Sequence, residues 1–296
     1  MDPSQLKGTH TALVTPMRDG TIHFEDLAQT VQRQIEAGIS GVAPAGTTGE
    51  SPTLNHAEHV EVIRCVVDSA SGRVPVIAGT GSNSTREAVE LTKAADEAGA
   101  DAFLIVAPYY NKPSQDGLFR HFGAIAEVTE KPIVLYSIPS RCGIEIGSET
   151  VARLHQKHPH VKAIKEAGGS CEKVSDLYRL LGSEFTILCG DDDLVLPFLS
   201  CGARGVISVA SNLIPDKLIR MTALAIDNDF QGALEIHQAY HSLFQALFVE
   251  PNPVPAKFLM KRMGLLESDE VRLPLSPLSK ENQTILSRLA AEIGLE

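Results

Sequence analysis

The sequence predicts a (β/α)8 barrel of the TIM type with a helical appendage at its C-terminal end. Eight short apolar segments rich in β-branched residues recur along the chain, and longer stretches with a helical spacing of apolar residues separate them. Each strand with its helix takes about 30 residues, which matches the length and order of such a barrel. A doubly wound sheet usually has fewer strands.

The eight predicted strands follow one another at fairly regular intervals. They are Ala12–Val14, Gly41–Ala43, Val74–Ala78, Ala102–Val106, Ile133–Tyr136, Val161–Ile164, Phe185–Leu188 and Gly205–Val209. Between the first two, Leu27, Val31 and Ile35 recur at steps of four, which is typical of one face of a helix.

Residues at the helix ends support this assignment. Three predicted helices are followed by a glycine, at Gly38, Gly99 and Gly202, shortly before the next strand. Asn55 and Ser84 precede two helical stretches and have a glutamate three residues further on. Such residues cap helix N-termini because their side chains accept hydrogen bonds from the first free backbone amides.

The last 70 or so residues differ from the repeating units. The helix of the eighth unit covers about residues 216–227, and beyond it the spacing of Leu234, His237 and Phe244 is helical. No low-complexity linker separates this region from the rest. We therefore expect a catalytic barrel of residues 1–225 and a helical domain of residues 226–296 packed on it.

Charge and composition exclude several classes of protein. The 296 residues include 26 Lys and Arg against 37 Asp and Glu, a net charge of −11, which disfavours binding to nucleic acid or to an anionic membrane. No apolar run reaches the roughly 20 residues of a membrane span, and the N-terminus lacks the order of a secretory signal. With five scattered cysteines, we expect a cytoplasmic protein with reduced thiols.

In this fold the reacting groups follow the C-terminal ends of the strands. Lys165 stands at the end of the sixth predicted strand, where alternation places it on one face with Val161 and Ala163. A barrel interior is dry, and desolvation favours the neutral amine that attacks a carbonyl carbon to form a Schiff base. The alternative is a lysine that extends from the strand end into solvent.

Polar residues at neighbouring strand ends favour the catalytic interpretation. The phenol of Tyr136, on the adjacent strand, is placed to transfer protons, although buried tyrosines often only pack. Thr47 and Thr48 lie between two glycines in a loop suited to hold a carboxylate. Arg141 follows in a proline-containing loop and suits a second carboxylate, although most arginines make surface ion pairs.

Four motifs together resemble a known family. They are Gly-Thr-Thr-Gly-Glu at 46–50, Pro-Tyr-Tyr-Asn-Lys-Pro at 108–113, Tyr-x-x-Pro-Ser-Arg-x-Gly at 136–143 and Lys-Glu-Ala at 165–167. In this order they resemble the dihydrodipicolinate synthase family, one of the pyruvate-dependent class I aldolases that include N-acetylneuraminate lyase. The resemblance implies that pyruvate condenses with L-aspartate 4-semialdehyde to give 4-hydroxy-tetrahydrodipicolinate for lysine and diaminopimelate biosynthesis.

The resemblance also implies roles for individual residues. Lys165 resembles the Schiff-base lysine, Tyr136 the proton-transfer phenol and Thr47 the hydroxyl that links two tyrosines. Tyr110 resembles the tyrosine that a neighbouring subunit supplies, which implies a homotetramer built as a dimer of dimers. The implied substrate contacts are Thr48 and Arg141 for the carboxylates of pyruvate and of the semialdehyde, with Gly190 and Ile207 lining the pyruvate site. Neither a metal nor an organic cofactor is implied.

Some members of the family are inhibited by lysine at a site between subunits. The residues that match this site are Ser51, His59, Asn83, Glu87 and Tyr109. Insensitive members tend to lack the equivalents of His59 and Glu87, so their presence predicts lysine inhibition here. The alternative is that both are ordinary residues on helix surfaces.

The chain departs from the family pattern at a few positions. Ser137 and Cys142 stand where asparagine and threonine are usual, and Gly168 stands where threonine is frequent. The first two bear on the second substrate more than on pyruvate, because serine and cysteine are weaker hydrogen-bonding partners of similar size.

Two other functions and one other site remain open from the sequence. One function is a related lyase that acts on a 2-keto-3-deoxy sugar acid with the same lysine chemistry. The other is a catalytically silent barrel that serves as a scaffold. The run Asp191-Asp192-Asp193 suggests a metal site, but aspartates after a strand are ordinary helix caps, so we expect no metal.

Overall fold

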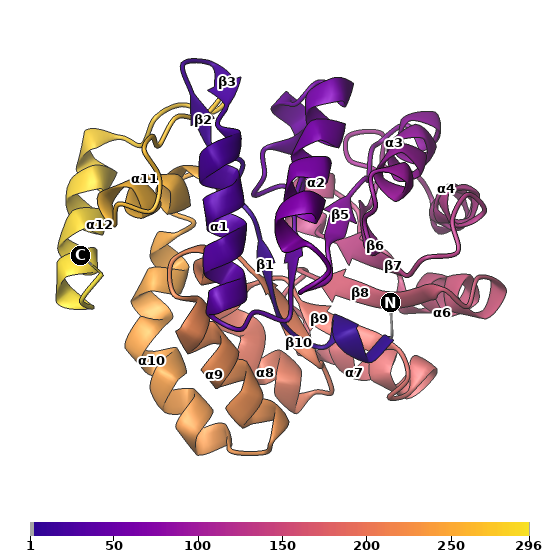
Figure 1. Ribbon diagram of the computed structural model, residues 1–296. Coiled ribbons are helices and arrows are strands. Elements are labelled where there is room, and N and C mark those ends of the chain that lie inside the picture. The colour runs from indigo at the N-terminus through magenta and orange to yellow at the C-terminus, as the bar shows by residue number, and fades with distance from the viewer. Residues whose placement is uncertain (1–2, 296) are drawn as a thin grey trace.

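The computed structural model describes residues 3–295 and shows the expected barrel of parallel strands surrounded by helices (Figure 1). The strands are β1 (Gly8–Ala12), β4 (Gly41–Ala43), β5 (Ile77–Gly79), β6 (Ala102–Val106), β7 (Ile133–Ser137), β8 (Val161–Glu166), β9 (Thr186–Cys189) and β10 (Gly205–Ser208). Their order in the sheet is β4-β1-β10-β9-β8-β7-β6-β5. A parallel bridge between Val42 and Val76 joins the two edges, so that the barrel is nearly closed.

Helices alternate with these strands and cover the outside of the barrel (Figure 1). They are α1 (Phe24–Glu36), α2 (His56–Ala70), α3 (Thr85–Glu97), α4 (Gln115–Ala126), α6 (Ser148–Lys157), α7 (Cys171–Leu181), α8 (Val195–Ser200) and α9 (Pro215–Ile226). Short helical turns lie in the connections: η1 (Pro3–Leu6), η2 (Ser51–Thr53), α5 (Pro139–Cys142), η3 (Asp192–Leu194) and η4 (Ala210–Asn212).

β4 and β6 have the predicted bounds, whereas β1 is displaced from its predicted position. β1 begins at Gly8, four residues before the predicted Ala12. Its residues Thr9, His10 and Thr11 are polar yet buried, and Thr11 donates a hydrogen bond to the side chain of Gln34. An apolar pattern therefore misses this strand, because each of these polar side chains is buried and makes a hydrogen bond inside the protein.

An antiparallel ribbon was not expected from the sequence. β2 (Met17–Arg18) and β3 (Thr21–Ile22) pair with each other after β1. The two residues between them, Asp19 and Gly20, have φ values of 52° and 76°. Positive φ at both central positions is typical of a two-residue hairpin turn.

The predicted helix caps are largely confirmed. The Asn55 side chain accepts from the amide of Glu58, whose carboxylate accepts from the amide of Asn55, which completes a capping box. Ser84 likewise accepts from the amide of Glu87. The Glu87 carboxylate, however, pairs with other side chains, described below. Gly38, Gly99 and Gly202 have the positive φ of residues that end helices.

The C-terminal region is helical, with α10 (Phe230–Ala246), α11 (Val254–Arg262) and α12 (Lys280–Glu292). Figure 1 shows α10 beside α9, and α11 lies next to α12. After α11, the amide of Glu267 donates to the carboxylate of Asp26 on α1. The proposed domain division after residue 225 lies one residue before the end of α9.

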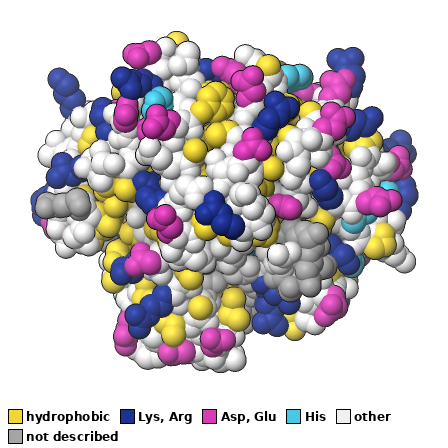
Figure 2. Space-filling view, in the orientation of Figure 1, with side chains coloured by type: hydrophobic (Ala, Val, Ile, Leu, Met, Phe, Trp, Pro, Cys, Tyr) yellow, Lys and Arg dark blue, Asp and Glu magenta, His cyan; other side chains and the backbone are white. Residues whose placement is uncertain are grey.

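Figure 2 shows acidic and basic side chains interspersed on one face of the molecule. Along residues 3–295, none of the helices is long and apolar enough to cross a membrane.

Candidate active site

Lys165 and Tyr136 lie side by side at the ends of β8 and β7. They are direct partners in the parallel pairing of these strands, and the Lys165 Nζ lies 4.4 Å from the centroid of the Tyr136 ring. Only 5% of each residue is exposed. The Lys165 amine on β8 is thus largely shielded from water and lies beside the Tyr136 phenol. The alternative that Lys165 extends into solvent is wrong.

The next residue on each strand belongs to a buried charged group. The Glu166 carboxylate is fully buried, and the Lys173 Nζ from α7 lies 2.9 Å from its Oε2 and 3.1 Å from the Ser137 Oγ. Burial raises the pKa of Glu166, and the nearby ammonium of Lys173 opposes this shift. Lys173 therefore contacts both strands one residue beyond Tyr136 and Lys165, so it stabilises their ends.

The loop that follows β4 carries the two threonines. Thr47 lines a small cavity together with Tyr136 and also lines a larger pocket outside it. Thr48 is buried, and its hydroxyl oxygen accepts a hydrogen bond of 2.9 Å from the Asn252 side chain. The hydroxyl of Thr15 donates to the carbonyl of Gly49 at 2.7 Å. The loop is thus held at several points beside Tyr136.

Close packing of the strand ends explains why position 190 is a glycine. The Gly190 amide donates to the carbonyl of Glu166 at 2.8 Å, and a Cβ on Gly190 would lie 2.5 Å from the Cβ of Ala167. Only glycine fits this approach without a shift of the backbone. Ile207, on the next strand β10, is fully buried.

The aspartates after β9 do not cap a helix as expected. Asp191 precedes η3 without a side-chain cap hydrogen bond, and the buried Asp192 accepts from the amides of Val209 and Ala210. These bonds join the ends of β9 and β10, so the expectation of a helix cap is wrong. Burial raises the pKa of Asp191 to about 6, and the charge of Lys165 opposes the shift. Across residues 3–295, no three His, Cys, Asp or Glu side chains cluster as metal ligands would.

Arg141 lies on the short turn α5, which ends at Cys142 and is followed by Gly143 with a φ of 71°. The neighbouring Cys142 is buried and its thiol donates to the carbonyl of Ala107 at 3.1 Å. Ser137, a second departure from the family pattern, accepts from Lys173 and from the amide of Ile146. Ser137 and Cys142 therefore both have hydrogen-bond partners within the chain.

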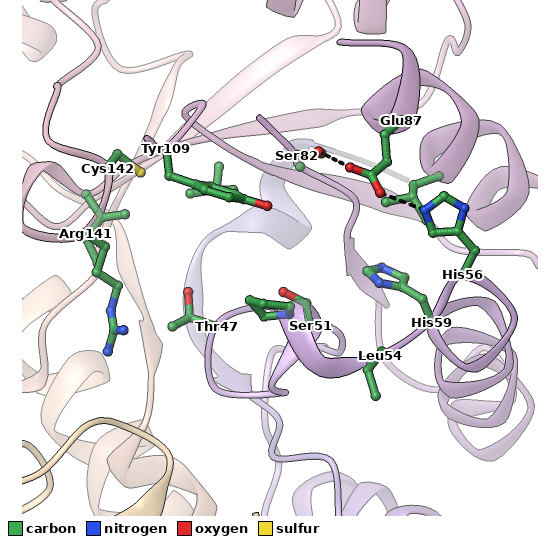
Figure 3. A pocket seen from close by; sticks show the side chains of 15 residues that line it. Thr47, Ser51, Leu54, His56, His59, Ser82, Glu87, Tyr109, Arg141 and Cys142 are labelled. Carbon is green, nitrogen blue, oxygen red and sulfur yellow. Dashed lines mark hydrogen bonds and ion pairs between the residues drawn. The ribbon is translucent and has the colours of Figure 1, made fainter. Parts of the chain in front are cut away.

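A pocket of about 350 Å³ lies next to these residues (Figure 3). In Figure 3, Arg141 and Thr47 lie on one side of it and the group of His56, His59 and Glu87 on the other. Glu87 accepts from the hydroxyl of Ser82 and lies 2.7 Å from the His56 Nε2. These two hydrogen bonds hold the pKa of Glu87 below its usual value.

Four of the five residues assigned to lysine binding line this pocket, namely Ser51, His59, Glu87 and Tyr109. His59 is buried, its Nε2 lies 2.7 Å from the Gly79 carbonyl, and burial lowers its pKa. Asn83 is not among the lining residues, and its carbonyl accepts from the side chain of Asn111.

Among the polar residues that line this pocket, sequence reasoning missed two. His56 and Ser82 both contact Glu87. His56 lies three positions before His59 on one helix, so the two side chains lie on the same face. This spacing could have indicated His56 as a pocket residue. Ser82 had no comparable signal.

Tyr110 points away from the chain that carries it. It is 89% exposed and has a φ of 72°, whereas its neighbour Tyr109 lines the pocket. Within this chain Tyr110 does not reach Tyr136 or Thr47 through a described contact, and its assigned role requires a second subunit.

Comparison with known proteins agrees with this geometry. The family model described as the dihydrodipicolinate synthetase family matches residues 5–293. The chain belongs to the dihydrodipicolinate synthetase family. A 4-hydroxy-tetrahydrodipicolinate synthase of Persephonella marina is 46% identical over 290 residues, which cover 98% of this chain and 99% of the relative.

Two solved structures of this family are similar over nearly the whole chain. The chloride-inhibited dihydrodipicolinate synthase of Acinetobacter baumannii, complexed with pyruvate, has a TM-score of 0.94 and 40% identity, covering 98% and 99% of the two chains. The enzyme of Cyanidioschyzon merolae, solved with lysine bound, has a TM-score of 0.96 and 39% identity, covering 99% of both. These matches support an enzyme of this family over a sugar-acid lyase or a silent scaffold.

Proposed function

We propose that the chain condenses pyruvate with L-aspartate 4-semialdehyde through a Schiff base on Lys165 and gives 4-hydroxy-tetrahydrodipicolinate. The observation that carries this proposal is the shielded Lys165 amine packed on the Tyr136 ring, in a barrel whose relatives carry this activity in their names. A structure of one relative contains pyruvate. The product would serve lysine and diaminopimelate biosynthesis.

The proposed reaction starts at the Lys165 Nζ. The neutral amine attacks the carbonyl carbon of pyruvate, and the oxygen leaves as water after the carbinolamine is protonated. Tyr136 is the phenol beside this nitrogen, so we assign the proton transfers to it. Thr48 and the loop amides would hold the pyruvate carboxylate, and Gly190 and Ile207 would line the site.

Carbon–carbon bond formation then uses the iminium as an electron sink. The iminium makes the methyl group of pyruvate acidic, and loss of a proton gives an enamine that attacks the aldehyde carbon. The amino group of the semialdehyde portion displaces Lys165 by transimination, which closes the ring. Arg141 would hold the carboxylate of the semialdehyde. The lysine itself supplies the electron sink, so the reaction needs no metal or organic cofactor.

We propose that the active form is the homotetramer that the family resemblance implies. Tyr110 can join the relay of Thr47 and Tyr136 only from a neighbouring subunit, so one chain alone would lack the complete relay. Its exposed side chain supports this role. The five free thiols also support a cytoplasmic location.

A coupled assay tests the proposed substrate. Turnover with pyruvate and aspartate semialdehyde should exceed turnover with sugar-derived aldehydes by at least tenfold. Equal or greater turnover of a sugar-derived aldehyde would contradict the proposal.

We propose in addition that lysine inhibits the enzyme in the pocket of Figure 3. The Glu87 carboxylate suits the cationic amine of lysine, and a relative has been solved with lysine bound. Saturating lysine should lower the initial rate. An unchanged rate would contradict this second proposal.

A further inference from the structure

A buried ion pair connects the C-terminal segment to the loop after β4. Lys257 on α11 and Glu50 at the end of the loop are both fully buried, and the Lys257 ammonium pairs with the Glu50 Oε1. The Arg272 amide donates to the Glu50 Oε2 at 3.1 Å, and Lys257 also donates to the carbonyl of Glu270 at 2.8 Å. Both oxygens of this carboxylate are therefore held by residues more than 200 positions away in the sequence.

A second contact from the same segment reaches Thr48. The Asn252 side chain, just before α11, donates to the Thr48 hydroxyl oxygen, and both residues are buried. A hydroxyl has one hydrogen to donate and can also accept. Because Asn252 supplies a donor, the hydrogen of Thr48 remains available for a carboxylate.

The backbone of the loop needs such support. Ala45 and Glu50, which flank the two threonines, have φ values of 53° and 54°. Residues other than glycine adopt this left-handed conformation at a cost, and it persists where surrounding contacts hold it. Glu50 is held through its side chain by Lys257 and Arg272.

We propose that Asn252 and Lys257 are positioning residues for pyruvate, which fix the Thr47–Thr48 loop through Thr48 and Glu50. This inference rests on the proposed function, because it assigns the loop to the pyruvate carboxylate. It makes the helical appendage a part of the catalytic unit rather than an independent module.

The main test is Asn252→Ala, which removes the contact to Thr48 and leaves the ion pair intact. The readout is the pyruvate concentration that gives half-maximal borohydride trapping, together with KM and kcat. We expect this concentration and the KM for pyruvate to rise about tenfold, the effect of one lost hydrogen bond. The kcat at saturating pyruvate should change by less than about threefold, since Asn252 does not contact Lys165 or Tyr136 in the described structure.

Lys257→Met tests the ion pair, and Lys261→Met is its matched control. Lys261 lies one turn further along α11 and pairs at 2.7 Å with Asp269 of the same segment. The Lys261→Met variant should bind pyruvate as the unchanged protein does. Lys257→Met should raise the KM for pyruvate. If it fails to fold because Glu50 is left unpaired, the double variant Glu50→Gln/Lys257→Met removes both charges and should likewise show a raised KM for pyruvate.

The outcomes separate this inference from the proposed function. If the unchanged protein traps pyruvate and both Asn252→Ala and the folded ion-pair variant trap it at the same concentrations, the positioning role is wrong. A fall in kcat alone, with KM unchanged, would also overturn it. If the unchanged protein traps no pyruvate, the proposed function fails and this inference fails with it.

Discussion

Replacing Lys173 by methionine tests how the ends of β7 and β8 are stabilised. The substitution leaves the Glu166 carboxylate, which is fully buried, without the ammonium 2.9 Å away. Removing one partner of a buried ion pair costs about 3–5 kcal/mol, because the remaining charge has neither solvent nor a counter-charge. Lys173 is itself only 10% exposed, so solvent screens little of this interaction. We expect a loss of about 3 kcal/mol of unfolding free energy at pH 8.

The penalty should depend on pH in a defined direction. Burial raises the pKa of Glu166 in the folded protein, and loss of Lys173 raises it further, because the ammonium opposes the shift. A carboxyl group with a higher pKa in the folded state than in the unfolded state binds protons preferentially when folded. Stability of the variant therefore increases as pH falls through the folded pKa, and its deficit should be smaller at pH 6 than at pH 8.

Urea unfolding followed by circular dichroism at one fixed protein concentration measures this deficit. Lys157→Met is the control, because Lys157 forms an exposed pair with Glu127 at 4.0 Å. It should lose less than about 0.5 kcal/mol at either pH. The reasoning is refuted if Lys173→Met is as stable as this control at pH 8, or if its deficit grows as pH falls.

Three further predictions concern the proposed reaction. Tyr136→Phe should lower kcat by about 10²–10⁴, because it removes the phenol that transfers protons; a steady-state rate close to that of the unchanged protein would contradict this role. Arg141→Ala should raise the KM for aspartate semialdehyde at least tenfold and spare the borohydride-trapped pyruvate adduct, whereas an equal loss of both would show that Arg141 does not act on the second substrate. Glu87→Gln should weaken lysine inhibition at least tenfold without changing the rate in the absence of lysine, and unchanged inhibition in a lysine titration would exclude Glu87 from the effector site.

Strand and helix spacing in the sequence predicts the barrel well, because each unit repeats the same local pattern. The strand bounds are less predictable where the buried residues of a strand are polar. β1 contains buried threonines and a histidine whose hydrogen bonds lie inside the fold, so no apolar pattern marks it. The two-residue strands β2 and β3 are too short to show a periodicity at all.

Part of the candidate site was predictable because its residues follow strand ends in recognisable motifs. Lys165 and Tyr136 meet because parallel strands end at the same edge of the barrel. The supporting residues were not predictable in this way. Asn252 and Lys257 lie 204 and 207 positions from the loop residues that they contact, and a single sequence gives no sign of such long-range partners.

Borohydride reduction in the presence of pyruvate, followed by peptide mass mapping, tests the central claim most directly. The account predicts one reduced pyruvate adduct per chain, located on Lys165 and absent from a Lys165→Ala variant that remains folded. An adduct on a different lysine, or none at all in the unchanged protein, would contradict the account.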